Sequence, residues 1–327
     1  MVVDPGCMKC LDCVSVCPNN ALFYGFGKPS VAKGPAKNEQ PKVRYDLTWP
    51  EEIGLALVFF GTFMATRGVY GLIPMLMAVG IAGVTTYLVW KLWRMIRHNN
   101  VNLHKFRMKY KGRLQLSGLV FAGVSIASIL LVMHSGFMRS AKAMAGYYDD
   151  QVPAPINSVY FDPDFKLTDE QYSSANRALH WYQLSSSVQH GGVGFATTWQ
   201  SDIDIRRAWL LSAQGEFEQA EQLIRDRLTE GEQRVPYLRG LGLTLLAQNK
   251  TDAALEHYRQ VLIERRDTGA LLNDLVQWAQ RTGNFDPVID LCEARRQTFE
   301  DDPAALRWLA LLRLETGNMQ QGLDLLK

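Results

Sequence analysis

Hydrophobic and polar positions divide the chain into an apolar central region and two more polar ends. Residues 53–66, 72–93 and 114–134 contain almost no charged side chains. The second and third segments are long enough to cross a hydrocarbon core of roughly 30 Å as helices, whereas the first is short for that distance. The pattern predicts a transmembrane region of about three helices over residues 49–135. Buried helices of a water-soluble protein are the alternative.

Lys and Arg are distributed unevenly around these segments. The connection between the second and third segments carries Arg94, Arg97, Lys105, Arg107, Lys109, Lys111 and Arg113. The turn between the first two has only Arg67, and Arg139 and Lys142 follow the third. Because basic loops stay on the cytoplasmic side, we expect a multi-pass protein of a bacterial-type inner membrane, with the N-terminus cytoplasmic and residues after 134 extracytoplasmic. If residues 53–66 are re-entrant, two crossings remain and both ends lie on one side.

A short turn motif recurs at 34-residue intervals in the last part of the chain: Gly215-Glu216-Phe217, Asn249-Lys250-Thr251, Gly283-Asn284-Phe285 and Gly317-Asn318-Met319. Small or modest residues keep step with it, at Ala220, Ala254, Val288 and Gly322, and the preceding helices share Leu241, Leu275 and Leu309. Such spacing predicts stacked pairs of helices that cross closely at the small residues. Residues 168–190 are predicted to add a helix that caps the stack.

This pattern resembles the tetratricopeptide repeat, over roughly residues 201–327. The resemblance implies an α-solenoid, within a repeat domain of residues 168–327, whose extended inner surface binds another protein. The match is degenerate at Arg207, which stands at a leucine position, and at Asn249, which stands at the turn glycine. On this period the fourth repeat would continue past Lys327, so we expect the chain to be cut short at its C-terminus.

The N-terminal segment carries the motif with the most specific chemistry. Cys7, Cys10, Cys13 and Cys17 have the spacing C-x2-C-x2-C-x3-C and are followed directly by Pro18. Three thiolates at gaps of two residues can wrap a short loop around one face of an iron-sulfur cubane. Tetrahedral zinc usually takes two ligands from each of two separated knuckles, so this spacing is unusual for zinc. Surface thiols or a disulfide pair are the remaining alternative.

The cysteine motif resembles the bacterial ferredoxin type of 4Fe-4S module and covers about a tenth of the chain, within a segment of residues 1–27. The resemblance implies a 4Fe-4S cluster whose iron is bound by Cys7, Cys10, Cys13 and Cys17. In two-cluster ferredoxins the fourth cysteine of such a motif ligates the other cluster, and no second motif follows here. Either Cys17 binds the same cluster, or a companion motif lies upstream of Met1 and the N-terminus is truncated.

Composition limits the partners and the kinds of covalent or catalytic site that the chain can have. The 327 residues are 47% hydrophobic and 21% charged, and a formal charge of +2 gives no indication of a nucleic-acid partner. Only Cys292 lies outside the cluster motif, which excludes a disulfide framework and agrees with a reducing compartment for the cluster. The basic, proline-containing residues 28–48 are predicted to be a linker, and so are residues 136–167. No nucleophile-base set, paired acids or phosphate loop stands out.

Two classes of function fit a mainly α protein that combines a short iron-sulfur segment, transmembrane helices and an α-solenoid. The layout resembles membrane-bound polyferredoxin-type proteins, although the further Cys motifs of that family are absent. This resemblance implies an electron carrier or redox subunit, with a redox partner protein, a protein ligand for the repeats and the lipid bilayer as partners. The alternative is a membrane scaffold or assembly factor that acts through its repeats and carries a structural or sensing cluster.

Overall fold

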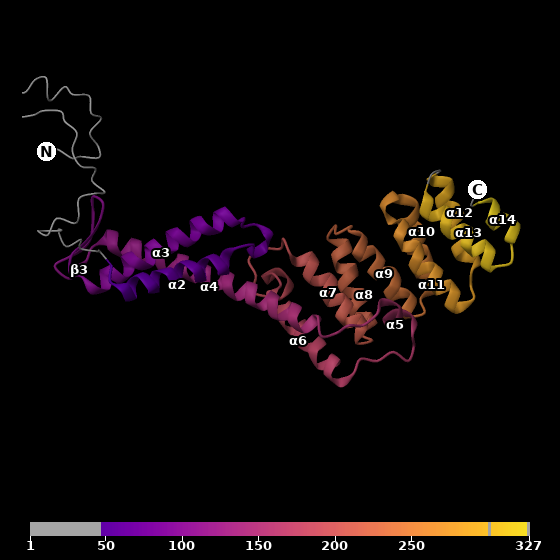
Figure 1. Cartoon of the computed structure of the whole chain (residues 1–327), viewed down its shortest axis with the longest axis horizontal. Helices are drawn as coiled ribbons and strands as arrows, with labels where there is room; N and C mark the ends of the chain where they lie inside the picture. Colours follow the sequence, from indigo (N-terminus) through magenta and orange to yellow (C-terminus); the bar gives the residue numbers. More distant parts are fainter. Residues whose placement is uncertain (1–46, 300–301, 326–327) are drawn as a thin grey trace, which may run out of the picture. The chain divides into compact units, whose positions relative to one another are not determined.

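The structure, a computed structural model, describes residues 47–299 and 302–325. These residues are mainly helical, which confirms the predicted fold class at that level (Figure 1). The predicted iron-sulfur segment, residues 1–27, lies outside the described residues, and so does nearly all of the linker 28–48.

The apolar region begins with three elements: α2 (Trp49–Thr66), the 3-10 helix η2 (Val69–Gly71) and α3 (Met75–Arg97). The connection reverses direction tightly because Gly68, Tyr70 and Gly71 all have positive φ angles. Pro74 stands at the N-cap of α3, where its lack of an N–H removes no helical hydrogen bond. Apolar residues on these helices face outward, and Leu76 is 81% exposed.

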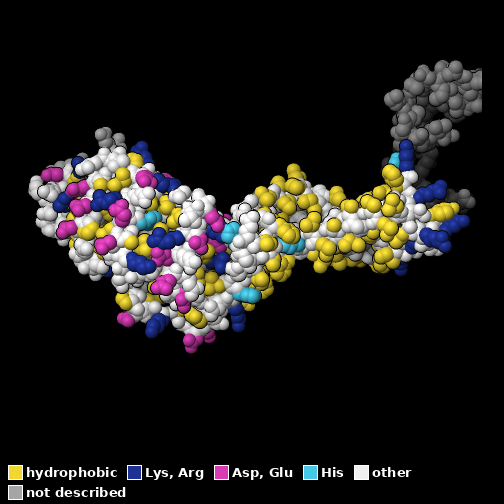
Figure 2. All heavy atoms as spheres, turned by 180° about the vertical axis from the view of Figure 1, so that it is seen from behind, with side chains coloured by type: hydrophobic (Ala, Val, Ile, Leu, Met, Phe, Trp, Pro, Cys, Tyr) yellow, Lys and Arg dark blue, Asp and Glu magenta, His cyan; other side chains and the backbone are white. Residues whose placement is uncertain are grey.

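Two of the described helices, α3 and the 34-residue α4 (Leu116–Asp149), are long and apolar enough to cross a membrane. Little of their apolar windows is buried inside the molecule, unlike the core helices of a water-soluble protein. Figure 2 shows hydrophobic side chains covering the visible face of this region, whereas basic and acidic side chains are mixed over the helices that follow.

The basic connection between α3 and α4 is a small antiparallel sheet rather than a plain loop. Its strands lie in the order β1 (Val101–Leu103), β2 (Phe106–Tyr110) and β3 (Arg113–Leu114). Met108 of β2 packs in a small core with Met95 and Val101. Gly118 of α4 lies against the carbonyl oxygen of Met108, where a Cβ would collide with the backbone. The sheet is therefore held against both helices.

Helix α4 continues well beyond the third apolar segment. At 1.5 Å per residue it is about 50 Å long, so it exceeds a hydrocarbon core of roughly 30 Å. Its C-terminal part is buried at Met138, Ala141 and Ala145, and α6 (Asp169–Ser185) packs against α4. The predicted linker 136–167 thus contains the end of α4 and the short helix α5 (Ile156–Phe161). Both helical segments pack their apolar side chains against neighbouring helices.

Helix α6 begins with a capping box between Thr168 and Gln171 and is followed by the 3-10 helix η3 (Val188–His190). After η3 the chain forms four successive helix pairs. The pairs are α7 (Gln200–Ala213) with α8 (Phe217–Thr229), α9 (Val235–Ala247) with α10 (Thr251–Glu264), α11 (Leu272–Thr282) with α12 (Asp286–Thr298), and α13 (Pro303–Glu315) with α14 (Met319–Asp324). The 3-10 helix η4 (Arg266–Leu271) separates the second and third pairs.

The recurring sequence positions occupy equivalent places in the four pairs. Each turn contains a left-handed residue, Gly215, Asn249, Gly283 and Gly317, with φ angles of 84°, 58°, 74° and 82°. Asn tolerates this conformation better than most side chains, which explains Asn249 at a glycine position. The small residues in step with these turns are buried, namely Ala220, Ala254, Val288 and Gly322. Gly242 of α9 touches the ring of Tyr258 of α10, so a Cβ there would displace that ring.

Ion pairs that are buried or partly buried connect neighbouring helix pairs. Arg295 of α12 is fully buried, pairs with Asp302 at the start of α13, and donates to the carbonyl oxygens of Leu262 at 2.6 Å and Arg266 at 2.7 Å. Arg239 of α9 donates two hydrogen bonds of 2.7 Å to the carboxylate of Asp274 in α11. Both charges of the Arg295–Asp302 pair are buried, so loss of one partner would leave the other uncompensated, whereas the Arg239 side chain is 37% exposed and its partner Asp274 is buried.

Candidate functional site

The four predicted cluster ligands, Cys7, Cys10, Cys13 and Cys17, lie outside the residues that the structure describes. Their assignment to an iron-sulfur cluster therefore stays a prediction. Within residues 47–299 and 302–325, no group of three or more His, Cys, Asp or Glu side chains is placed to hold a metal ion.

Cys292 is a buried structural thiol. Its side chain in α12 has no exposed surface and belongs to the main hydrophobic core of the helix pairs. Burial raises the pKa of this thiol to about 12, and the nearby Arg295 guanidinium offsets only part of that effect. A thiol with such a pKa is protonated at neutral pH, and the thiolate is the reactive form. Burial therefore separates the Cys292 thiol from solvent and disfavours its reactive form.

The structure brings together one serine-histidine-carboxylate set that the sequence did not reveal. Ser187 Oγ lies 2.6 Å from His190 Nδ1, and His190 Nε2 lies 3.6 Å from a carboxylate oxygen of Glu230. However, Ser187 is 2% exposed, so a substrate cannot reach its hydroxyl. The amides of Gly192 and Gly194 already donate to the carbonyl oxygens of Ser187 and Ser186, and they are not free to bind an oxyanion. The set joins the loop after α6 to α8 and is structural.

A large candidate site among the described residues lies where α5 crosses the first helices of the pairs. Val159 and Tyr160 of α5 are buried against Ala213 of α7 and Leu243 of α9. The ring of Tyr160 lies 5.9 Å from that of Trp209 and 6.2 Å from that of Phe217. Such tilted aromatic pairs add to the free energy gained from burial. These contacts explain why a six-residue segment between prolines adopts a helix here.

Polar interactions of Tyr160 and Phe161 fix the orientation of α5. Burial raises the pKa of the Tyr160 phenol, and hydrogen bonds with Ser212 and Thr244 oppose that shift. Arg281 of α11 donates a 2.8 Å hydrogen bond to the carbonyl oxygen of Phe161, and its guanidinium lies 5.7 Å from the centre of the Phe161 ring. The segment is therefore bound to the first three helix pairs, through the Tyr160 side chain and the Phe161 backbone.

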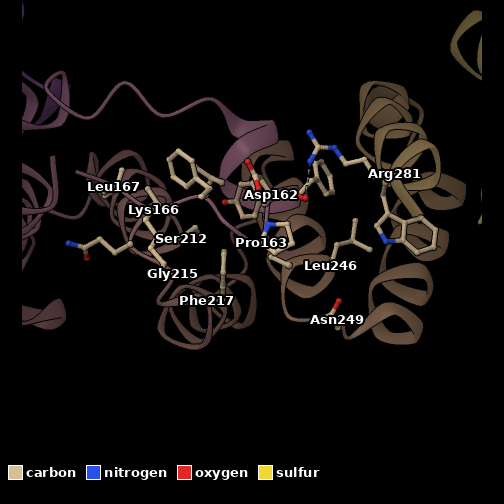
Figure 3. A pocket seen from close by; sticks show the side chains of 18 of the residues that line it. Asp162, Pro163, Lys166, Leu167, Ser212, Gly215, Phe217, Leu246, Asn249 and Arg281 are labelled. Carbon is tan, nitrogen blue, oxygen red and sulfur yellow. Dashed lines mark hydrogen bonds between the residues drawn. The ribbon is translucent and has the colours of Figure 1, made fainter. Parts of the chain in front are cut away.

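A cleft of about 1040 Å³ lies beside this segment, and Figure 3 shows its lining. Residues 159–169 form one part of the wall, and the ends of the helices that bound the turns form the other. Aromatic and charged side chains are interspersed in the lining, and they include Phe165, Phe217, Trp278, Asp162, Lys166 and Arg281. In Figure 3, Lys166 and Arg281 lie toward opposite sides of the cleft. An elongated ligand with apolar groups and separated charges fits such a lining better than a compact metabolite does.

The structure thus tests none of the four predicted cluster ligands, and the cleft beside α5 is a feature that the sequence did not indicate. No protein-family model matches the chain, and no curated protein matches it.

Proposed function

We propose that this chain is a membrane-anchored electron-transfer protein with an N-terminal 4Fe-4S segment and a tetratricopeptide-like domain that docks a partner protein. The observation that carries the proposal is the motif Cys7, Cys10, Cys13, Cys17 and Pro18, because four soft thiolates in this spacing suit the iron atoms of one cubane. When bound, the cluster supplies one-electron oxidation and reduction. The apolar helices α3 and α4 support the membrane anchor.

The other residues of the chain position this segment and a partner. Residues 28–48 tether the cluster segment to α2, and their cations favour the cytoplasmic face of the membrane. The four helix pairs supply a docking surface, because their 34-residue period and close crossings are typical of tetratricopeptide solenoids. Extended surfaces of this type bind polypeptides through several shallow contacts.

The proposal is tested by reconstituting the full-length protein with iron and sulfide under anaerobic conditions. We expect about four iron atoms per chain, broad visible absorption, and bleaching of that absorption on addition of one electron per cluster. Tight binding of zinc without binding of iron would exclude electron transfer. A cluster that binds but cannot be cycled between two redox states would instead favour the scaffold or assembly factor with a structural cluster.

The proposed orientation gives a separate prediction about membrane topology. With three crossings, the basic connection between α3 and α4 is cytoplasmic and residues after Ala145 are extracytoplasmic. External protease should therefore cleave the helix pairs in intact spheroplasts and spare a tag inserted at Gly112. In this arrangement α2 crosses the membrane in addition to α3 and α4, and its 18 residues are close to the minimum length for a span. Tags at the N-terminus and after Ser140 on the same side would establish two crossings and exclude this arrangement.

A further inference from the structure

The membrane-spanning region is exceptional in its charge. From Ile53 to Tyr148 the sequence contains no Asp or Glu, although Lys and Arg occur throughout the connection between α3 and α4. The cations of the helix pairs, by contrast, repeatedly meet carboxylates, as in the pairs Arg239–Asp274 and Arg225–Glu221. Residues 53–148, which include the three-stranded sheet, therefore supply no carboxylate to neutralise its positive surface, and the nearest acidic residues along the sequence are Glu51 and Glu52 in the first turn of α2 and Asp149 at the end of α4. Figure 2 shows dark blue side chains gathered at this end of the apolar helices.

Aromatic rings separate these cations and hold them in place. The Arg107 guanidinium and the Lys111 ammonium lie 5.4 Å and 5.5 Å from the centre of the Tyr110 ring. In the last turns of α3, Lys91 and Arg94 lie 4.7 Å and 5.3 Å from the Trp90 ring. Tyr and Trp side chains favour the level of lipid headgroups, where one part of the ring is apolar and the other polar.

The surface formed by the sheet and the start of α4 combines exposed apolar side chains with a cleft that polar residues line. Phe106 at the tip of the sheet is 66% exposed, and Leu116 at the start of α4 is 78% exposed. Between sheet and helix lies a cleft of about 310 Å³ lined by Arg107, Tyr110, Gln115, Leu116 and Ser117. The guanidinium of Arg107 matches the geometry of a phosphodiester, and the exposed Phe106 and Leu116 match acyl chains.

We propose that the sheet between α3 and α4 is a binding surface for anionic phospholipids, with Arg107, Lys111 and Arg113 contacting the phosphate headgroups. The inference rests on the membrane insertion of the proposed function and is independent of the iron-sulfur cluster. A bilayer leaflet is the occupant because the exposed apolar residues are continuous with the apolar faces of α3 and α4, which already require lipid. A soluble acidic protein would leave these apolar residues in water.

The experiment compares lipid binding by the full-length protein and two variants with equal changes in charge. The test variant is Arg107→Gln, Lys111→Gln and Arg113→Gln. Its matched control is Arg259→Gln, Arg296→Gln and Arg307→Gln, which removes three cations from the helix pairs. Each detergent-solubilised protein is titrated with phosphatidylglycerol and with phosphatidylcholine, and bound lipid is counted by native mass spectrometry. Insertion is measured separately, as resistance to carbonate extraction from phosphatidylcholine vesicles.

We expect the unmodified protein and the control to prefer phosphatidylglycerol, and the test variant to lose this preference by more than about tenfold, since each cation near an anionic surface contributes about fivefold. All three proteins should still insert. Equal binding of the two lipids by the unmodified protein, or an equal loss in both variants, would overturn the inference. Displacement of phosphatidylglycerol by about 10 mM inorganic phosphate would also overturn it, because the surface would then be a small-anion site. Failure of every protein to insert would instead contradict the proposed membrane anchor.

Discussion

Substitution of Cys10 by Ser should abolish binding of the 4Fe-4S cluster. Cys10 is the central cysteine of three at gaps of two residues, and its loss leaves one iron corner without a thiolate inside the loop. Anaerobic reconstitution of C10S should therefore give little iron and no broad visible absorption. Cys292→Ser is the matched control, because Cys292 lies buried in α12 and has no part in the motif. An unchanged cluster in C10S would refute the ligand assignment.

Cys17→Ser separates the two arrangements that the motif allows. If Cys17 binds the same cluster as the other three cysteines, C17S should lose most of its iron or retain an unstable, three-iron form. If Cys17 serves a cluster supplied by another segment or chain, C17S should keep a normal absorption spectrum and about four iron atoms. Iron content and electron paramagnetic resonance of the reduced protein distinguish these outcomes.

A large loss of stability is expected when the buried ion pair of Arg295 and Asp302 is broken. Asp302→Asn keeps an acceptor for the amide of Ala304, which Asp302 caps at 2.9 Å, but removes the negative charge beside Arg295. Because Arg295 has no exposed surface, its charge would be left uncompensated, and we expect a loss of about 3 kcal/mol in the free energy of unfolding of the helix pairs. Denaturant titration of the detergent-solubilised chain measures this loss.

The control for this prediction is Asp267→Asn, the same change in an exposed pair. Asp267 accepts from Arg265 at 2.7 Å, but its side chain is 57% exposed, so solvent screens the interaction. This variant should unfold at nearly the denaturant concentration of the unmodified protein. Similar losses in both variants would show that the Arg295–Asp302 pair has no special role and that the fold responds to the amide substitution itself.

The helix pairs were predictable because their signal is periodic and survives degeneracy at single positions. Asn249 breaks the glycine pattern, yet its left-handed backbone matches that of Gly215, since Asn also tolerates this conformation. The close approach of α9 and α10 follows similarly from Gly242, a small residue at a crossing. The identity of the repeat as tetratricopeptide and the presence of the cluster rest on sequence pattern alone.

Other parts of the fold depend on contacts between distant segments. Helix α5 forms because Val159 and Tyr160 are buried against α7 and α9, and nothing in its own six residues indicates that surface. The set of Ser187, His190 and Glu230 likewise joins two elements separated in sequence. The sheet between α3 and α4 could have been predicted, because Phe106, Met108 and Tyr110 alternate with basic residues at the period of two that is typical of a strand. Of these three side chains only Met108 is buried.

Arg295 also determines how the stack of helix pairs can come apart. In a linear array each unit contacts only its neighbours, and the last unit normally frays on its own. Here one side chain binds the end of α10, the 3-10 helix η4 and the start of α13, so it spans three consecutive units. Opening of the final pair would expose this charge and weaken the two preceding pairs at once. The C-terminal half of the stack should therefore unfold cooperatively, as one block, instead of fraying one helix at a time.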